Sequence, residues 1–249
     1  KTGPKYEPTT FAGMRTLVRR FAAGLLDLGL GHGDRAALIS EGRRDWIVAE
    51  LGILSTGAVN VPISVKVDEL GDLKFRLAHS GCRMAVVSKS QLGKIRQVRN
   101  DLPDLALTVV LDDVESPAGD EIAASEVFRR GDAFLATRAA ELEAARLAVR
   151  ESDPANICYT SGTTADPKGI VLTHRNYTAN IEQSRGLVDC PEHYVCLLIL
   201  PWDHSFCHTC GIYTIIMSGA AMAAVELGRT PMETLRNIPA NIREVRPHI

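Results

Sequence analysis

The chain has 249 residues, of which 45% are hydrophobic and 23% are charged, so it can bury a core and form one large domain or two small ones. Its formal net charge of −2 at pH 7 offers no positive surface to nucleic acid or an anionic membrane, and we expect neither as a partner. Six cysteines in a chain of this length do not form a disulfide scaffold. With no signal-peptide pattern, we expect reduced thiols and a cytoplasmic location.

The first elements alternate between helix and strand. Apolar residues recur at helical spacing over residues 14–28, and Thr10 is the candidate N-cap. The next predicted elements are a short buried strand at 35–40 (RAALIS), a helix at 45–57 that Gly57 closes, and a strand at 58–63 (AVNVPI).

The alternation continues towards residue 111. The predicted elements are a helix over about 68–79, a strand at 84–88 (MAVVS), a helix from Ser90 and a strand at 107–111 (LTVVL). Strands that are apolar throughout and rich in β-branched residues are typical of a parallel sheet with both faces covered. The sequence therefore predicts an α/β fold, with layered α/β lobes and mostly parallel sheets.

The pattern is weaker over 112–133, where we expect loops around a short helix. Residues 133–150 predict a helix with a solvated, charged face, and ESDPAN (151–156) ends it. Residues 205–225 carry no Asp, Glu, Lys or Arg and are just long enough to cross a bilayer. Their polar interruptions and Ala/Gly content instead predict a buried helix that leads into a buried strand, so we expect no transmembrane segment.

The most informative stretch is ICYTSGTTADPKGIVLTH (157–174), in which small residues stand between two strand-like runs. Glycine lets the backbone approach a ligand closely, successive N–H groups in a tight turn form a nest for phosphate oxygens, and a lysine adds a point charge. The spacing is neither that of a Walker A loop nor that of a dinucleotide-binding G-x-G-x-x-G. A surface turn uses similar residues, but consecutive hydroxyl-bearing residues followed by Pro-Lys-Gly favour a phosphate-binding loop.

A second notable stretch is DHSFCHTC (203–210), which has two histidines four residues apart and a C-x-x-C. Zinc ligands, a redox pair and the wall of a pocket are the alternatives. His204, Cys207 and His208 can share a helix face, but Cys210 cannot easily join them, which disfavours structural zinc. A redox pair needs a thioredoxin-like setting that the chain does not show. We therefore expect no metal site here.

YTSGTTADPKG (159–169) resembles the signature loop of the AMP-forming adenylating enzymes, which include acyl-CoA synthetases, peptide-synthetase adenylation domains and luciferases. The resemblance extends over nearly the whole chain. Residues 33–63 are similar to an early segment of the family, LTHRN (172–176) to the continuation of the loop, and LPWDHSF (200–206) to a segment whose histidine lies beside the acyl pocket. Ala165 departs from the pattern, because most members have glycine there, and a side chain disfavours positive φ.

The resemblance implies a two-step reaction with ATP, Mg²⁺ and CoA. A carboxylate attacks the α-phosphate of ATP to give acyl-AMP and pyrophosphate, and the CoA thiol then takes the acyl group. The phosphate-binding positions of the family fall on Thr160, Ser161, Gly162, Thr163, Thr164 and Lys168. His204 would be the catalytic residue in the acyl pocket, with Cys207, His208 and Cys210 as wall or core residues. The apolar, Ala/Gly-rich stretch that follows suits a fatty or other hydrophobic acid.

Three later features of the family are absent from these residues: a Tyr-Gly-x-Thr-Glu motif, a Thr-Gly-Asp motif and the C-terminal subdomain with its catalytic lysine. We therefore expect the N-terminal part of the large domain of an acyl-adenylate-forming enzyme. Two interleaved lobes are expected, 10–64 with 196–249, and 65–195. The chain by itself should have little adenylating activity, and its uncovered sheet edges and apolar faces could pair in a homodimer.

Two other functions stay open at this point. One is an amino-acid-activating adenylation domain, which usually needs an acidic residue for the substrate ammonium group. The other is a non-catalytic nucleotide-binding relative, in which the downstream glutamate or lysine would be replaced. A panel of carboxylic and amino acids would distinguish the first alternative from an acyl-CoA synthetase.

Overall fold

The computed structural model describes residues 5–160, 166–187, 189–228 and 230–249. Contacts divide the chain into two compact units, and each is described by itself. The sheet unit comprises Thr10–Ser40 and Asp45–His174, and the C-terminal unit comprises Lys1–Thr9, Glu41–Arg44 and Arg175–Ile249.

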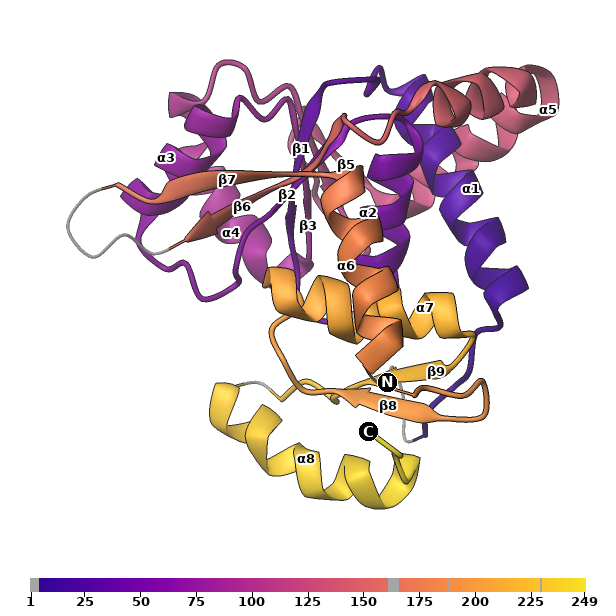
Figure 1. The fold of residues 1–249 in the computed structure, drawn as a ribbon. Coiled ribbons are helices and arrows are strands. Elements are labelled where there is room, and N and C mark those ends of the chain that lie inside the picture. The colour runs from indigo at the N-terminus through magenta and orange to yellow at the C-terminus, as the bar shows by residue number, and fades with distance from the viewer. Residues whose placement is uncertain (1–4, 161–165, 188, 229) are drawn as a thin grey trace. The chain divides into compact units, whose positions relative to one another are not determined.

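The sheet unit is built on a seven-stranded sheet with the order β5-β4-β3-β1-β2-β6-β7 (Figure 1). Its strands are β1 (Arg35–Ile39), β2 (Val59–Pro62), β3 (Met84–Val87), β4 (Leu107–Val110), β5 (Glu121–Ala123), β6 (Pro154–Thr160) and β7 (Lys168–Thr173). Neighbouring strands are parallel throughout, except that β6 and β7 form an antiparallel hairpin at one edge. The predicted α/β fold with a mostly parallel sheet is confirmed.

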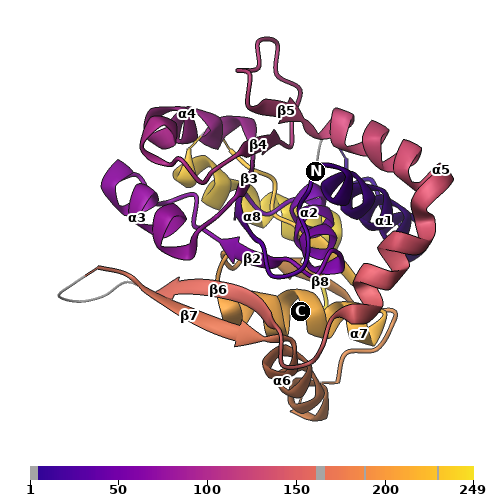
Figure 2. The same cartoon turned by 90° about the horizontal axis from the view of Figure 1, so that it is seen from above.

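Helices cover both faces of this sheet. They are α1 (Phe11–Asp27), α2 (Arg44–Ser55), α3 (Leu70–Ser80), α4 (Lys89–Val98) with the short 3₁₀ turn η1 (Arg99–Asp101), and α5 (Ala124–Ala148). Figure 2 shows α3 and α4 on one face and α1, α2 and α5 on the other. Leu73, Leu77 and Ile95 of the first pair pack on buried strand residues such as Ile39 and Val87. This layering explains why the strands are apolar throughout.

Local signals in the first half of the chain formed as predicted. The Thr10 hydroxyl caps α1 by accepting a hydrogen bond from the Gly13 backbone N–H at 3.1 Å. The predicted second helix ends at Ser55, and Gly57 follows it with a φ of +79°, a backbone conformation that favours glycine. Strands and helices up to β4 lie within a few residues of their predicted bounds.

The stretch 112–133 is more regular than its pattern predicted. It forms β5 and the first turns of α5, which begins at Ala124. The prediction of loops around a short helix was wrong there, because β5 has only three residues and Gly131 lowers the helix propensity of the turns that follow. α5 also bends at Arg138, whose φ of −127° and ψ of 22° are not helical.

The first half of α5 lies directly against α1, because each helix has a glycine at the contact. A Cβ atom on Gly131 would lie 1.9 Å from the carbonyl oxygen of Arg20, and one on Gly24 would lie 2.1 Å from that of Val127. Arg20 and Asp132 add a bidentate ion pair between the same helices, with both N–O distances at 2.6 Å. Small residues therefore set how closely the two helices approach.

The C-terminal unit contains a two-stranded parallel sheet with helices around it. Its elements are α6 (His174–Leu187), β8 (Val195–Leu198), a π-helix (Cys207–Tyr213), α7 (Thr214–Ser218), β9 (Ala221–Ala224) and α8 (Pro231–Val245). The predicted helix followed by a strand over 205–225 is confirmed, although the helix starts as a π-helix and the strand is half-buried. Among the described residues there is no helix with the length and hydrophobicity needed to span a bilayer.

The division into units differs from the lobes expected from the sequence, 10–64 with 196–249 and 65–195. β1 lies between β2 and β3 in a single sheet, so residues 35–62 and 84–110 share one unit. Alternating helices and strands predict a parallel sheet, but they do not specify the order of its strands, and the order decides where a unit ends.

Gly131→Ala should lower the free energy of unfolding by about 1–3 kcal/mol, because the added methyl group must push α1 and α5 apart. Gly93→Ala in α4 is the matched control, since nothing lies within 4 Å of the Cβ position there. That change should stabilise the protein by about 0.5–1 kcal/mol. Urea denaturation measures both effects, and a stabilised Gly131→Ala protein would contradict the close-contact explanation.

Candidate functional site

The base of the predicted phosphate loop is the β6–β7 hairpin. Across its ladder, Tyr159 pairs with Gly169 and Thr160 pairs with Lys168, so the last two pairs bring the two ends of the loop together. Thr160 and Lys168 are both exposed. The other predicted phosphate-binding residues lie outside the described residues, and so does Ala165; they are Ser161, Gly162, Thr163 and Thr164.

A buried polar cluster joins this hairpin to the parallel sheet. Glu50 of α2, Asn60 of β2 and Asn156 of β6 are each fully buried. The Nδ2 groups of Asn60 and Asn156 donate to the two carboxylate oxygens of Glu50, the second at 3.3 Å. Asn60 and Asn156 are also register partners between β2 and β6. Since a buried carboxylate is costly without hydrogen-bond donors, this cluster fixes β6 against β2.

Tyr159, directly before Thr160, is held from α3. Its hydroxyl donates to the carbonyl oxygen of Arg76 at 3.2 Å and lies 2.9 Å from Nδ1 of His79. The Arg76 guanidinium lies 5.3 Å from the centre of the Tyr159 ring and forms a bidentate ion pair with Asp72 at 2.7 and 3.0 Å. Burial raises the pKa of the Tyr159 phenol, which keeps it protonated. The residue next to the start of the loop is therefore held in place by its side chain.

His174 does not lie at the loop end of the hairpin. It follows β7 directly, and β7 begins at Lys168, so at about 3.3 Å per residue the two Cα atoms are about 20 Å apart. Its backbone N–H donates to the carbonyl oxygen of Asp153 at 3.1 Å. Burial lowers the pKa of its imidazole, and the charge of Asp153 opposes this shift. These contacts favour a structural role for His174 over contact with a bound phosphate.

The C-terminal unit contains a candidate residue of its own, His204. Its side chain is exposed, and its Nδ1 accepts a hydrogen bond from the backbone N–H of Phe206 at 3.2 Å. A neutral imidazole that accepts at Nδ1 carries its proton on Nε2. His204 can therefore present Nε2–H as a donor to a ligand.

A small apolar cavity of about 240 Å³ lies beside His204. Its walls are formed by Leu200, Pro201, His204, Phe206 and Cys207. Cys207 is fully buried, and burial raises the pKa of its thiol to about 12, so it acts as a wall rather than a nucleophile. The cavity combines an apolar lining with one polar donor, a combination typical of small-molecule sites.

His208 packs in the core of the C-terminal unit. It is fully buried, stacks on Tyr213 at 5.9 Å between ring centres and meets the edge of Tyr177 at 6.0 Å. Burial lowers the pKa of its imidazole to about 4. Cys207 and His208 are thus buried, as expected of wall or core residues, whereas Cys210 is exposed on the π-helix. Within the described ranges no group of three or more His, Cys, Asp or Glu side chains is arranged to hold a metal ion.

The β6–β7 hairpin lies in a chain whose whole sequence was compared with known protein families. The family model for AMP-binding enzymes matches residues 3–249. The chain belongs to this family. Membership of the AMP-binding enzymes agrees with the resemblance seen at 159–169, and the phosphate-binding roles of Thr160 and Lys168 stay predictions.

Similar proteins include a long-chain-fatty-acid–CoA ligase of Mycobacterium bovis, 32% identical over 170 residues that make up 68% of this chain and 27% of that protein. The 4-coumarate–CoA ligase 2 of Oryza sativa subsp. japonica is 30% identical over 229 residues, 89% of this chain and 39% of that one. The apo structure of MbtA from Mycobacterium smegmatis has a TM-score of 0.77 at 27% identity, with 96% of this chain and 44% of that chain covered. The chain thus spans less than half the length of these relatives.

Sequence reasoning missed two features of the site. The Glu50 cluster joins residues up to 106 positions apart, and the Tyr159–His79 contact joins residues 80 positions apart. Asn60 and Asn156 are polar residues inside otherwise apolar strand runs, and that interruption is the signal that could have revealed the cluster.

Tyr159→Phe should lower the free energy of unfolding by about 1 kcal/mol, because the ring stays while its hydroxyl hydrogen bonds are lost. A double-mutant cycle with His79→Phe should show coupling, since the two side chains share one contact. Tyr194→Phe is the matched control, because in the described part of the chain its hydroxyl forms no hydrogen bond. Additive effects at 159 and 79 would contradict the contact.

His208 should make stability depend on pH. Its pKa is about 4 in the folded chain and returns to about 6.5 on unfolding, so between these values only the unfolded chain binds the proton. The contribution is therefore fully present above about pH 6.5 and falls by about 3 kcal/mol as the pH drops to about 4. Denaturant titrations from pH 7 to 4 measure it. His208→Phe should flatten the profile and His193→Gln should not; an unchanged profile in His208→Phe would refute the assignment.

Proposed function

We propose that the whole protein activates a carboxylic acid with ATP and transfers the acyl group to the thiol of CoA. The observation that carries this proposal is the β6–β7 hairpin in a chain of the AMP-binding family, with Thr160 and Lys168 opposed at the base of a Ser/Thr/Gly segment. Two similar proteins are named as CoA ligases, one for long-chain fatty acids and one for 4-coumarate.

The first step is acyl adenylation. A carboxylate oxygen forms a bond to the α-phosphorus of ATP, and the bond from that phosphorus to the bridging oxygen of pyrophosphate breaks, so pyrophosphate leaves with the electron pair. In the second step the sulfur of CoA bonds to the acyl carbon, loses its proton and displaces AMP. Catalysis of this kind depends on positioning and on stabilising charge that develops on leaving oxygens.

The hairpin residues serve the leaving pyrophosphate in this proposal. Lys168 has an exposed ammonium group that can neutralise charge on the β- and γ-phosphate oxygens, and the exposed Thr160 hydroxyl can donate to the same oxygens. Ser161, Gly162, Thr163 and Thr164 share this role by their place in the motif. Because Tyr159 and Glu50 fix β6, Thr160 is positioned before ATP binds.

His204 serves the acid. Its Nε2–H can donate to a carboxylate oxygen, since Nδ1 already accepts from the Phe206 backbone. The apolar cavity beside it, about 240 Å³ in volume, supports a hydrophobic acyl group as substrate. An acid with an aliphatic or aromatic body therefore fits better than one whose body carries a further charge.

Mg²⁺ belongs to the proposal as the partner of the ATP phosphates. The described residues contain no cluster of carboxylate, imidazole or thiol ligands for a metal ion. Mg²⁺ would neutralise charge on the β- and γ-phosphate oxygens in this proposal.

ATP–pyrophosphate exchange by the full-length protein tests the proposal. A panel of fatty, aromatic and amino acids should support exchange best with a hydrophobic carboxylic acid, and CoA should then yield the thioester. Exchange with amino acids alone would indicate an amino-acid-activating enzyme instead, and no exchange with any acid would support a non-catalytic relative.

Lys168→Gln should lower the exchange rate about 100-fold, because one positioned charge on the leaving group is lost. Lys66→Gln is the matched control, since Lys66 is an exposed lysine outside the hairpin. Equal rates for Lys168→Gln and the unmodified protein would contradict the role of Lys168. The 249-residue chain by itself should show little exchange, because it spans less than half of its relatives.

A further inference from the structure

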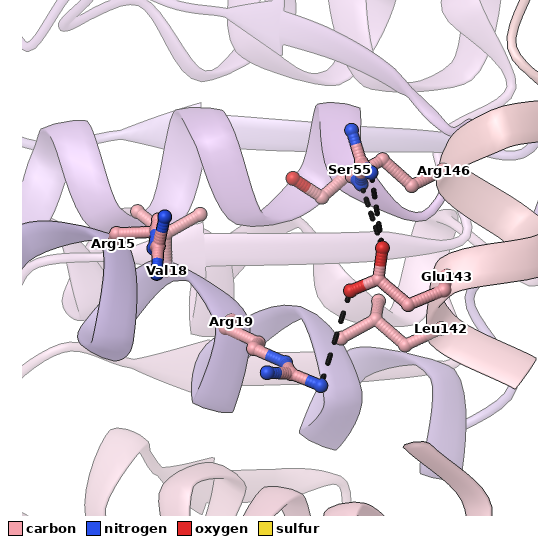
Figure 3. Close-up of a pocket in the computed structure, with 7 residues that line it drawn as sticks. All are labelled: Arg15, Val18, Arg19, Ser55, Leu142, Glu143 and Arg146. Atoms are coloured by element: carbon pink, nitrogen blue, oxygen red, sulfur yellow. Dashed lines mark hydrogen bonds and ion pairs between the residues drawn. The ribbon is translucent and has the colours of Figure 1, made fainter. Parts of the chain in front are cut away.

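A larger pocket lies elsewhere in the sheet unit, between α1, the C-terminal end of α2 and the second half of α5 (Figure 3). Its volume is about 510 Å³. It is lined by Arg15, Val18, Arg19, Ser55, Leu142, Glu143 and Arg146. This volume falls within the range of small-molecule pockets, about 300–1,000 Å³.

Helical spacing explains why these side chains meet. Arg15 and Arg19 stand four residues apart on α1, and Leu142 and Arg146 stand four apart on α5, so each pair shares one face of its helix. Figure 3 shows the two faces turned towards the same space. Leu142 is 2% exposed and forms an apolar floor together with the half-buried Val18.

The pocket lies beside the part of α5 that follows its bend. Before Arg138 the helix is held against α1 at Gly131, and after Arg138 it changes direction, as Figure 2 shows. The bend is braced on both sides. The Arg138 guanidinium lies 4.3 Å from the centre of the Phe134 ring and pairs with Glu141 at 2.7 and 2.8 Å. The pocket is thus a built feature of the fold.

The pocket has a surplus of positive charge. Its three arginines face a single carboxylate, Glu143. Glu143 accepts from Arg146 at 3.0 and 3.2 Å and lies 3.9 Å from Arg19. Arg15 has no ion pair or side-chain hydrogen bond with any residue that the structure describes. A dianion would balance the two remaining charges.

We propose that this pocket binds a small phosphate monoester with an apolar or aromatic body. The phosphate dianion pairs with the guanidinium groups of Arg15 and Arg19, whose planar forks match phosphate oxygens. The apolar body lies on Val18 and Leu142. The Ser55 hydroxyl already donates to the carbonyl oxygen of Leu51 at 2.6 Å, so its lone pairs are available to accept from a ligand hydroxyl.

This pocket is separate from the phosphate-loop hairpin within the same unit. The ends of β6 and β7 next to residues 161–165 point away from α5 in both Figure 1 and Figure 2. A ligand in the pocket therefore does not contact Lys168. A substitution at Lys168 distinguishes binding in the pocket from binding at the β6–β7 hairpin.

Calorimetric titration of the purified protein with phenyl phosphate tests the proposal. We expect saturable binding at one site that Lys168→Gln leaves unchanged. Arg15→Ala should weaken binding about 10-fold, and Arg15→Ala with Arg19→Ala should weaken it further, because each change removes a charged hydrogen-bond donor. Arg129→Ala is the matched control, since it removes an exposed arginine of α5 outside the pocket.

Two comparisons define the ligand class. Inorganic phosphate should bind more weakly than phenyl phosphate, because it leaves the apolar floor uncovered. Isophthalate, a dicarboxylate, should also bind more weakly, because carboxylates are planar and carry less charge per group. Tighter binding of isophthalate, loss of phenyl phosphate binding in Lys168→Gln, or unchanged binding in the double arginine variant would each overturn the proposal.

Discussion

The position of the β6–β7 hairpin depends on one buried carboxylate. Glu50 lies inside the sheet unit, where an unpaired charge would be costly, and it accepts from one asparagine on each of two neighbouring strands. β6 runs parallel to β2 and antiparallel to β7, so the carboxylate attaches the first strand of the hairpin to the parallel sheet. Tyr159 then fixes the far end of β6 to α3. Thr160 therefore extends from a strand that is held at both ends.

Much of the fold could be predicted because its signals are local. Periodic apolar residues, an N-cap at Thr10 and a glycine at position 57 define the first helices, and short β-branched runs define β1 to β4. Thr160 and Lys168 were selected as phosphate-binding residues from local residue types, and that role stays a prediction. Their pairing in one ladder follows from two strand-like runs that stand close together in the sequence.

What could not be predicted depends on partners far apart in the chain. The low helix propensity of Gly131 disfavours a helix at that position. The helix forms nevertheless, because a glycine there lets α5 pack closely against α1. The strand order places residues 35–62 between segments that follow much later, so lobe boundaries could not be read from alternation. The π-helix at 207–213 has no periodic signature, and its extra residue per turn places Cys210 at the surface although Cys207 and His208 are buried.

Because Thr160 and Lys168 pair across the ladder, an insertion or deletion between them differs in its effect from one within a strand. Residues added or removed between these two positions alter the length of the loop, while the ladder below keeps its register. A residue added within β7 would instead turn every later side chain of that strand to the opposite face, because side chains alternate along a strand. A change between Thr160 and Lys168 therefore leaves the faces of the two strands as they are, whereas a single insertion within β7 changes the surface that this strand presents.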